Sequence, residues 1–301
     1  MQSCRPHAGM CIERRVRAGC HMRKNVRQAL LWLCIFLAMG FICMPGLWVV
    51  LNAFRPNVAI LGNENPLNFS SYTLDNFRNI LGLGGIQPLP VLAYFRNSMI
   101  ISMTSTVMAL VVGLAGGYAF ARFHFRGKNA MFVGLMLTRA IPGVALSLPI
   151  FIIWSWLGLL DTMPGVIMVY LAMNVPFTIW LLDGFLRQVP QELSQAARID
   201  GCTAWQAFWK VEFPLARGGI AAAGIFAFLT SWNEFALASQ LTRSPDTKTM
   251  PVALMDFTAQ FTIDWAGMCA MAVLIIIPAL LLTFLVQKHL IAGLTLGGVK
   301  G

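Results

Sequence analysis

Six apolar runs, each about 20 residues long, limit the folds open to this chain more than any other feature of its sequence. An α-helix rises about 1.5 Å per residue, so about 20 apolar residues cross the hydrocarbon core of a bilayer. The runs lack the alternation typical of a membrane β-barrel, and a helix satisfies its own backbone hydrogen bonds in lipid. We therefore predict an all-α, polytopic membrane bundle of six transmembrane helices. The predicted spans are Leu30–Leu51, Ser98–Phe120, Met131–Trp156, Gly165–Phe185, Gly218–Ala238 and Gly267–Gln287.

The composition agrees with a membrane protein, because 57% of the residues are hydrophobic and only 11% are charged. A soluble domain carries about 25% charged residues. The third run differs from the others in holding Pro142, Gly143 and Pro149. Proline removes a helical hydrogen bond, so we expect a kink or local unwinding in this span.

Basic residues gather in every second segment between the runs, and in short loops they favour the cytoplasm. This pattern predicts that both termini lie inside and that the loops at 52–97, 157–164 and 239–266 lie outside. The net charge of +10 is then explained by orientation and anionic lipid, and we expect no nucleic acid partner. The predicted cytoplasmic residues are Arg5, Arg14, Arg15, Arg17, Arg23, Lys24, Arg27, Arg122, Arg126, Lys128, Arg187, Arg198, Lys210, Arg217, Lys288 and Lys300.

The N-terminal part divides into a basic cytoplasmic tail, residues 1–27, and a first transmembrane helix with its outer loop, residues 28–97. Residues 1–21 show no helical stripe. Two interpretations stay open for them: a lipid-binding arm, or translation that begins at Met22. Residues 289–301 form the predicted cytoplasmic C-terminal tail.

One polar stretch, "PQELSQAARIDG" at residues 190–201, interrupts the apolar sequence on the predicted cytoplasmic side. Pro190 suits the start of a helix, and Glu192 complements the positive end of the helix dipole. Gly201 permits a turn with positive φ. Thr203 can then cap a second helix that Pro214 is expected to stop. The pattern predicts a helix–turn–helix that contacts either a cytoplasmic partner or, through its aromatic residues, the membrane surface.

The whole stretch "PQELSQAARIDGCTAWQAFWKVEFPL" resembles the cytoplasmic EAA loop of permease subunits in bacterial ABC importers, in particular the maltose-type carbohydrate permeases. Similar segments run in order from about residue 93 to the end: "RNSMIISMTSTVMALVVGLAGGYAFARFHFRGK", "SWNEFALA" and "QKHLIAGLTLGGVKG". The resemblance implies a type I importer permease fold over residues 93–288, with a coupling loop at 186–217. The matching loop residues are Glu192, Ala196, Ala197, Asp200, Gly201 and Pro214.

Two loop positions depart from the family pattern. Gln195 replaces the glutamate that precedes the two alanines, and Phe213 replaces the leucine before the proline. In the family that glutamate helps to dock the permease onto the ATPase. Gln195 can donate and accept hydrogen bonds but cannot form an ion pair. We hypothesise that Glu192 supplies the missing charge.

The resemblance also implies the partners: a second permease subunit, two cytoplasmic ABC ATPase subunits, an extracytoplasmic solute-binding protein and the bilayer of a bacterial inner membrane. The outer loop before the last span resembles the segment that touches the binding protein. The chain has no G-x-x-x-x-G-K-[ST] motif, since "RGKNA" lacks the earlier glycine and the hydroxyl residue. ATP and Mg²⁺ are therefore expected on the partner ATPases, and this chain is expected to need no cofactor.

An ionisable residue inside an apolar span costs free energy of insertion and usually has a function. Arg139 is expected to face an interior cavity or a carboxylate, and Asp183 to lie in water near the cytoplasmic end. Glu234, with Asn233, is placed in the fifth span, where it either lines the solute path or makes a structural hydrogen bond. The small residues Gly113, Gly116 and Gly117 are expected to permit close helix packing.

Two other classes of protein are considered. An ion-coupled secondary transporter would show inverted repeats, and no convincing internal repeat is present. An intramembrane hydrolase would need a catalytic motif, but the sequence has no H-E-x-x-H, G-x-S-x-G or G-x-G-D, and its four histidines fall outside the predicted spans. The spacing of its seven cysteines fits no zinc site. We therefore predict no catalytic residue and no metal site. The solute stays open among sugars, oligosaccharides, polyols and glycerol phosphodiesters.

Overall fold

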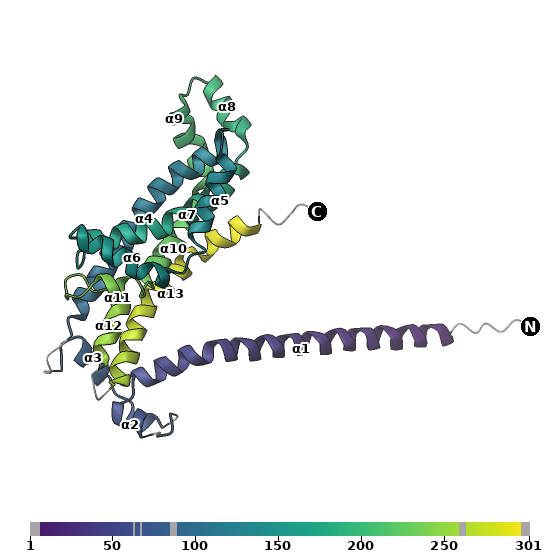
Figure 1. Ribbon diagram of the computed structural model, residues 1–301. Helices are drawn as coiled ribbons and strands as arrows, with labels where there is room; N and C mark the ends of the chain where they lie inside the picture. The colour runs from purple at the N-terminus through teal and green to yellow at the C-terminus, as the bar shows by residue number, and fades with distance from the viewer. Residues whose placement is uncertain (1–6, 63, 67, 85–88, 259–262, 296–301) are drawn as a thin grey trace, which may run out of the picture. The chain divides into compact units, whose positions relative to one another are not determined.

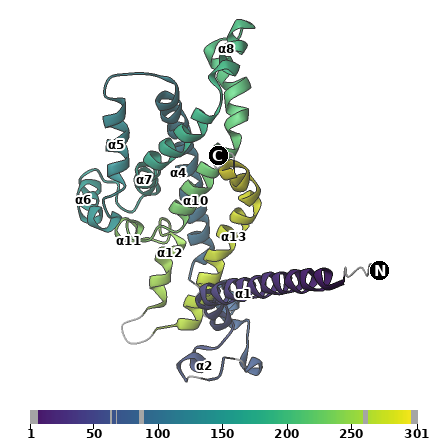
Figure 2. The same ribbon diagram turned by 90° about the vertical axis from the view of Figure 1, so that its right-hand side faces the viewer.

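A computed structural model describes residues 7–62, 64–66, 68–84, 89–258 and 263–295. The chain divides into two compact units, Met1–Leu51 and Asn52–Gly301, and each is considered by itself. In the described residues the secondary structure is helical, without a strand, which confirms the predicted all-α class. Figure 1 and Figure 2 show the helices in two views.

The first unit is built on α1 (His7–Ala53), a helix of 47 residues. Its apolar part, Leu30–Ala53, is long and hydrophobic enough to span a membrane, as predicted. The helix begins at His7, well before that span. The basic tail is therefore helical from that residue, although its sequence shows no helical stripe. Helical hydrogen bonds are local, and a span that is already nucleated can extend into polar sequence.

The second unit has a core of three long helices, α4 (Val91–Arg122), α7 (Met163–Gln188) and α10 (Phe213–Trp232). The other described elements of this unit are α2 (Asn57–Leu61), η1 (Phe69–Ser71), α3 (Asp75–Ile80), α5 (Lys128–Thr138), α6 (Gly143–Trp156), α8 (Gln191–Ile199), α9 (Ala204–Ala207), η2 (Phe208–Glu212), α11 (Ala238–Leu241), α12 (Met250–Ala253), η3 (Leu254–Phe257) and α13 (Trp265–Thr295).

Glycines bring α4 and α7 close together. A Cβ added to Gly113 would lie 2.3 Å from Thr178 Cγ2, and one added to Gly117 would lie 3.1 Å from the backbone nitrogen of Asp183. Gly116 faces Ile179 in the same way. Because small residues let helix backbones approach, the predicted packing role of the three glycines is confirmed.

A buried polar junction joins the three core helices. Ser231 on α10 lies 3.1 Å from Ser105 Oγ on α4 and accepts a hydrogen bond of 2.8 Å from Asn174 Nδ2 on α7. All three side chains are buried. Hydrogen bonds of this kind stabilise helix association where hydrocarbon offers no other partner.

The third predicted span is broken. Helices α5 and α6 meet at an angle of 92° across residues 139–142, where Pro142 precedes the first residue of α6. The unwinding expected at Pro142 is therefore confirmed, whereas Pro149 lies inside α6 without interrupting it. The described residues contain five helices able to span a membrane, or six if the bent pair counts as one span.

Two predicted helix ends are wrong. Pro214 does not stop a helix, because α9, the π-helical turn η2 and α10 follow one another without a gap. In an α-helix, a proline ring clashes with the carbonyl of the residue four positions earlier. For Pro214 that residue is Lys210, which lies in the wider π-helical turn η2, so the chain accommodates the ring without ending the helix. Helix α13 continues to Thr295, past the predicted end at Gln287, and residues 296–301 of the predicted tail lie outside the described residues.

The loops of the second unit gather at two ends, as the charge pattern predicts. At one end the C-terminus of α4 contacts the chain on both sides of α8 and α9, which project together in Figure 1. At the other end Asn97 contacts Pro245, and Asn57 contacts Ile263. Predicted cytoplasmic and outer loops therefore occupy opposite ends.

Candidate coupling and pathway sites

The polar stretch forms the expected helix and turn. Helix α8 begins after Pro190 and carries Glu192 in its first turn and Arg198 in its last. At its end Cys202 N–H donates to the Ala197 carbonyl at 3.0 Å and Gly201 N–H to the Arg198 carbonyl at 3.2 Å. This pair of bonds is a Schellman motif, and it needs the left-handed φ of 92° that Gly201 adopts.

The predicted docking residues of α8 face outward. Glu192, Gln195, Ala196 and Asp200 are exposed and Ala197 is half-buried. Within the described part of the chain, the polar side chains of Glu192, Gln195 and Asp200 have no hydrogen-bond or ion-pair partner. The side of α8 around the two alanines is shallow, so another backbone can approach it closely. Helix α8 thus offers unused polar groups around a flat centre.

Helices α8 and α9 form a helical hairpin, and its second helix, α9, begins with a capping box. The Thr203 hydroxyl accepts from Gln206 N–H, and the Gln206 side chain accepts from Thr203 N–H. Aromatic rings follow, with Trp205 and Trp209 exposed and Phe208 buried against Tyr118 of α4 at a centroid distance of 5.0 Å. These exposed rings suit the membrane surface that the sequence left open as an alternative contact for the hairpin.

A buried ion pair that the sequence analysis missed holds the base of the hairpin. Arg122 Nε at the end of α4 lies 2.9 Å from Glu212 Oε2, and their side chains are 9% and 1% exposed. The same guanidinium donates through Nη2 to the Val189 carbonyl at 3.0 Å. One side chain therefore ties α4 to the chain entering α8 and to the chain leaving α9. From the sequence, Arg122 is predicted only as a basic residue of a cytoplasmic loop, because no local signal pairs it with a residue 90 positions later.

A second pair corrects the expectation for Asp183. Its carboxylate is buried, 6% exposed, and both oxygens accept from Arg187 Nε at 2.9 Å. Arg187 also donates to the Phe120 carbonyl at the end of α4. Asp183 is therefore not in water. The four-residue spacing between these opposite charges on one helix was the available signal.

Arg139 lies at the break between α5 and α6. It is exposed, and its guanidinium sits 4.9 Å from the centre of the Phe177 ring on α7. In the described residues no carboxylate pairs with it. The expected carboxylate partner is replaced by an aromatic face, which attracts a cation through its quadrupole.

Asn233 and Glu234 lie beyond the end of α10, so their placement inside the fifth span is wrong. Asn233 caps that helix and donates to the Leu229 carbonyl. The Glu234 carboxylate accepts from Leu237 N–H at 2.8 Å and from Ala238 N–H at 2.9 Å. It thus satisfies the amide groups at the start of α11, and the alternative of a structural hydrogen bond fits this geometry.

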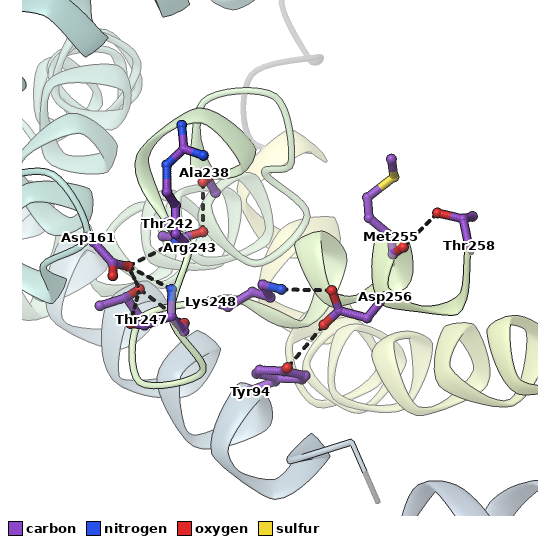
Figure 3. Close-up of polar contacts among 11 residues, drawn as sticks. Tyr94, Asp161, Ala238, Thr242, Arg243, Thr247, Lys248, Met255, Asp256 and Thr258 are labelled. Atoms are coloured by element: carbon purple, nitrogen blue, oxygen red, sulfur yellow. Dashed lines mark hydrogen bonds and ion pairs between the residues drawn. The ribbon is translucent and has the colours of Figure 1, made fainter. Parts of the chain in front are cut away.

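At the predicted outer end, residues 243–247 form a turn that is anchored to Asp161, a contact that the sequence did not reveal. Asp161 Oδ1 accepts from Arg243 N–H at 2.8 Å, from Ser244 N–H at 3.0 Å and from the Thr247 hydroxyl. Figure 3 shows these contacts beside a second cluster, in which Lys248 Nζ lies 2.7 Å from Asp256 and the Tyr94 hydroxyl donates to the same carboxylate. The loop that carries Asp161, the segment 243–256 and the first turn of α4 are therefore fixed to one another at this end.

The described residues contain no group of three or more His, Cys, Asp or Glu side chains that could hold a metal ion. Residues 109–295, more than half of the chain, match the family described as "binding-protein-dependent transport system inner membrane component". The chain belongs to this family. It is therefore a multi-pass protein of the bacterial inner membrane and a permease of the ABC importer class, not an ion-coupled secondary transporter.

Two curated relatives align with the permease over nearly its whole length. A probable ABC transporter permease protein of Sinorhizobium fredii is 34% identical over 91% of this chain and 96% of its own. A trehalose transport system permease of Mycobacterium tuberculosis is 35% identical over 92% of this chain and 100% of its own. A bacterial ABC transporter involved in alginate import has the same fold, with a TM-score of 0.74 over 88% of this chain and 97% of that one, at 19% identity.

The anchored turn of the permease should depend on the charge of Asp161. Burial opposes ionisation, but the hydrogen bonds from Thr247, Ser244 and Arg243 outweigh it and lower the pKa of Asp161 to about 2. An unfolded aspartate has a pKa of about 3.9, so the stabilisation is complete above that pH and is lost as the pH falls towards 2. We expect Asp161→Asn to lower the unfolding temperature of the purified protein at pH 7, with a difference from wild type that shrinks below pH 4.

The matched control for this prediction is Asp246→Asn. Asp246 lies in the same turn, is exposed, and has no hydrogen bond within the described residues. Its substitution should leave the unfolding temperature unchanged across the same pH range. Equal effects of the two substitutions would show that the turn does not depend on the Asp161 carboxylate.

Proposed function

We propose that this permease carries a sugar or oligosaccharide into the cell and that α8 receives the force for transport from separate ATPase subunits. The observation that carries the proposal is the set of unpaired polar side chains on α8, held on a hairpin whose base is fixed by Arg122. Free polar groups around a shallow centre suit a protein partner more than a lipid surface. The predicted cytoplasmic side places that partner in the cytoplasm.

The proposed assembly contains a second permease subunit, two cytoplasmic ABC ATPases and an extracytoplasmic solute-binding protein. ATP and Mg²⁺ bind to the ATPases, and this chain supplies no catalytic residue and no metal ligand. Support comes from the sequence, which lacks a phosphate-binding loop. The turn anchored by Asp161 lies at the predicted outer end and offers a rigid surface to the binding protein.

The carbohydrate class is supported by what the relatives are named for. Besides the trehalose permease, they include a diacetylchitobiose uptake permease of Streptomyces coelicolor, 33% identical over 89% of this chain. An arabinooligosaccharide permease of Halalkalibacterium halodurans is 34% identical over 93% of it. These names share sugars with more than one ring unit, so we propose that the solute is a disaccharide or a longer saccharide.

Within α8 we assign the ATPase contact to Glu192, Gln195, Ala196 and Ala197, with Asp200 and Gly201 shaping the turn behind them. Glu192 provides the negative charge that Gln195 lacks. We retain Arg139, Asn233 and Glu234 as residues beside the solute path. Asn233 and Glu234 act there as caps that fix the outer ends of α10 and α11.

The proposal predicts that Glu192→Gln weakens coupling. The substitution keeps the shape of the side chain and removes its charge, so the contact with the ATPase should lose about 1.4 kcal/mol, a factor of ten. The measurement is ATPase activity stimulated by the binding protein in the complete complex reconstituted in liposomes. Glu64→Gln, exposed at the predicted outer end, is the control and should leave that activity unchanged.

Two results would contradict the proposed function. Glu192→Gln with wild-type coupled activity would remove the role given to that charge. ATP hydrolysis by the purified permease without its partner ATPases would show that the chain contains a motor of its own.

A further inference from the structure

The break between α5 and α6 lies at membrane depth, because Arg139 at this break packs on Phe177, which is near the middle of the 26-residue helix α7. Helix α5 ends in turn bonds from Arg139 N–H to the Met136 carbonyl and from Ala140 N–H to the Leu137 carbonyl. The backbone is then irregular as far as Pro142, and residues 139–142 are all exposed. Irregular backbone at this depth is tolerated only where protein covers it or water reaches it. A charged side chain is subject to the same restriction.

Other exposed faces of the same unit have a different chemistry. On α4 the exposed face includes Met103, Val107 and Val111, and on α13 it includes Leu281 and Phe284. From Met103 to Val112 and from Ile276 to Leu285 the exposed side chains carry no charge, and their polar groups are the hydroxyls of Thr104 and Thr283. Uncharged faces of this kind suit lipid. The face at the α5–α6 break differs because it exposes the charged side chain of Arg139. We infer that this face does not contact lipid.

Aromatic rings surround the break. The Phe177 and Trp180 rings of α7 are 5.5 Å apart and inclined by 30°, and the Phe226 ring of α10 meets Phe177 edge-on at 5.6 Å. Trp180 is 45% exposed and Phe226 is 44% exposed. Along α10 the same face continues with Thr230, four residues further on, and with the C-terminal cap Asn233, seven residues further on.

Two of the donors on this face are unused within the described residues, whereas Thr230 and Asn233 donate to backbone carbonyls of α10. The Arg139 guanidinium has an aromatic neighbour but no hydrogen-bond acceptor, and the Trp180 indole N–H also lacks one. Donors without acceptors are costly away from water. A ligand with many hydroxyl oxygens and apolar ring faces satisfies both the donors and the exposed rings.

We propose that Arg139, Trp180 and Phe226 form a subsite that holds one sugar ring of the solute during its passage. The ring's C–H face stacks on Trp180 and Phe226, and its hydroxyl oxygens accept hydrogen bonds from Arg139 and the Trp180 indole. Phe177 positions Arg139 through the cation–π contact. This subsite rests on the proposed function, because it takes the solute to be a saccharide.

The first test asks whether water reaches the face, and it needs no knowledge of the solute. Trp180→Cys and Phe226→Cys variants of the complete complex are treated with the charged, water-soluble thiol reagent MTSET, and mass spectrometry locates the label. We expect both cysteines to react at least ten times faster than the cysteine of a Phe284→Cys control on the apolar face of α13. Equal rates at all three positions would overturn the subsite.

The second test measures transport. Complexes in liposomes receive labelled trehalose, diacetylchitobiose or arabinobiose with the binding protein and ATP, and sugar moved per ATP hydrolysed is recorded. Trp180→Ala should lower this ratio about tenfold, the equivalent of about 1.4 kcal/mol. Trp180→Phe, which keeps a stacking face, should lower it less than threefold, and Phe284→Ala should not change it.

The outcomes separate the subsite from the proposed function. A wild-type ratio for Trp180→Ala, with transport intact, overturns the subsite and leaves the importer function standing. A wild-type complex that hydrolyses ATP but moves none of the three sugars overturns the saccharide class, and the sugar subsite with it. Labelled cysteines together with the tenfold loss support both.

Discussion

Replacing Arg122 by alanine is expected to destabilise the cytoplasmic end of the bundle by about 3–5 kcal/mol and to abolish coupled transport. The substitution leaves the Glu212 carboxylate buried, 1% exposed, without its partner at 2.9 Å. It also removes the donor to the Val189 carbonyl. The Arg122 side chain fixes both ends of the α8–α9 hairpin to α4. Without it, force applied at α8 would no longer reach the helices of the core. The measurements are thermal unfolding of the purified complex and sugar moved per ATP hydrolysed.

The chain offers a matched control in the exposed pair Arg78–Asp75, whose side chains are each 63% exposed. Exposed pairs contribute about 0–1 kcal/mol, so Arg78→Ala should change stability little. The double substitution Arg122→Leu with Glu212→Leu removes both buried charges and should recover most of the lost stability. If Arg122→Ala unfolded at the same temperature as Arg78→Ala, the buried pair would have no structural role.

Replacing Gly113 by valine is expected to separate α4 from α7, at a cost of about 3 kcal/mol, the upper part of the usual range for overpacking. An added Cβ would lie 2.3 Å from Thr178 Cγ2 and 2.9 Å from Thr178 Cβ. Thr178 cannot turn away easily, since its side chain is β-branched and its hydroxyl donates to the Asn174 carbonyl at 2.9 Å. Unfolding temperature and yield of assembled complex are the measurements.

Gly184→Ala in α7 is the control for this prediction, because a Cβ at Gly184 would meet nothing within 4 Å. Alanine favours a helix over glycine by about 0.5–1 kcal/mol, so this variant should be as stable as wild type or slightly more stable. Equal stability of Gly113→Val and Gly184→Ala would show that the two helices do not approach as closely as the structure indicates.

The permease fold followed from sequence where the determinants are local. Apolar runs of bilayer length predicted the long helices, and the alternation of basic segments predicted which loops share an end. The turn at Gly201 was predictable because a left-handed residue after a helix favours glycine, whatever surrounds it. The candidate ATPase contact on α8 was proposed from the resemblance of its sequence to the EAA loop, since the residues alone left a membrane-surface contact open as well.

Only the tertiary structure decided which polar groups meet. The Arg122–Glu212 pair joins residues 90 positions apart, and Asp161 meets Thr247 across 86, so neither contact leaves a trace in a local pattern. Prolines show the same limit: Pro142 lies at a break, whereas Pro149 and Pro176 lie inside helices. Helix formation depends on neighbours in the sequence, but the partners of a buried charge, and the tolerance of a proline, depend on what the other helices bring to that point in space.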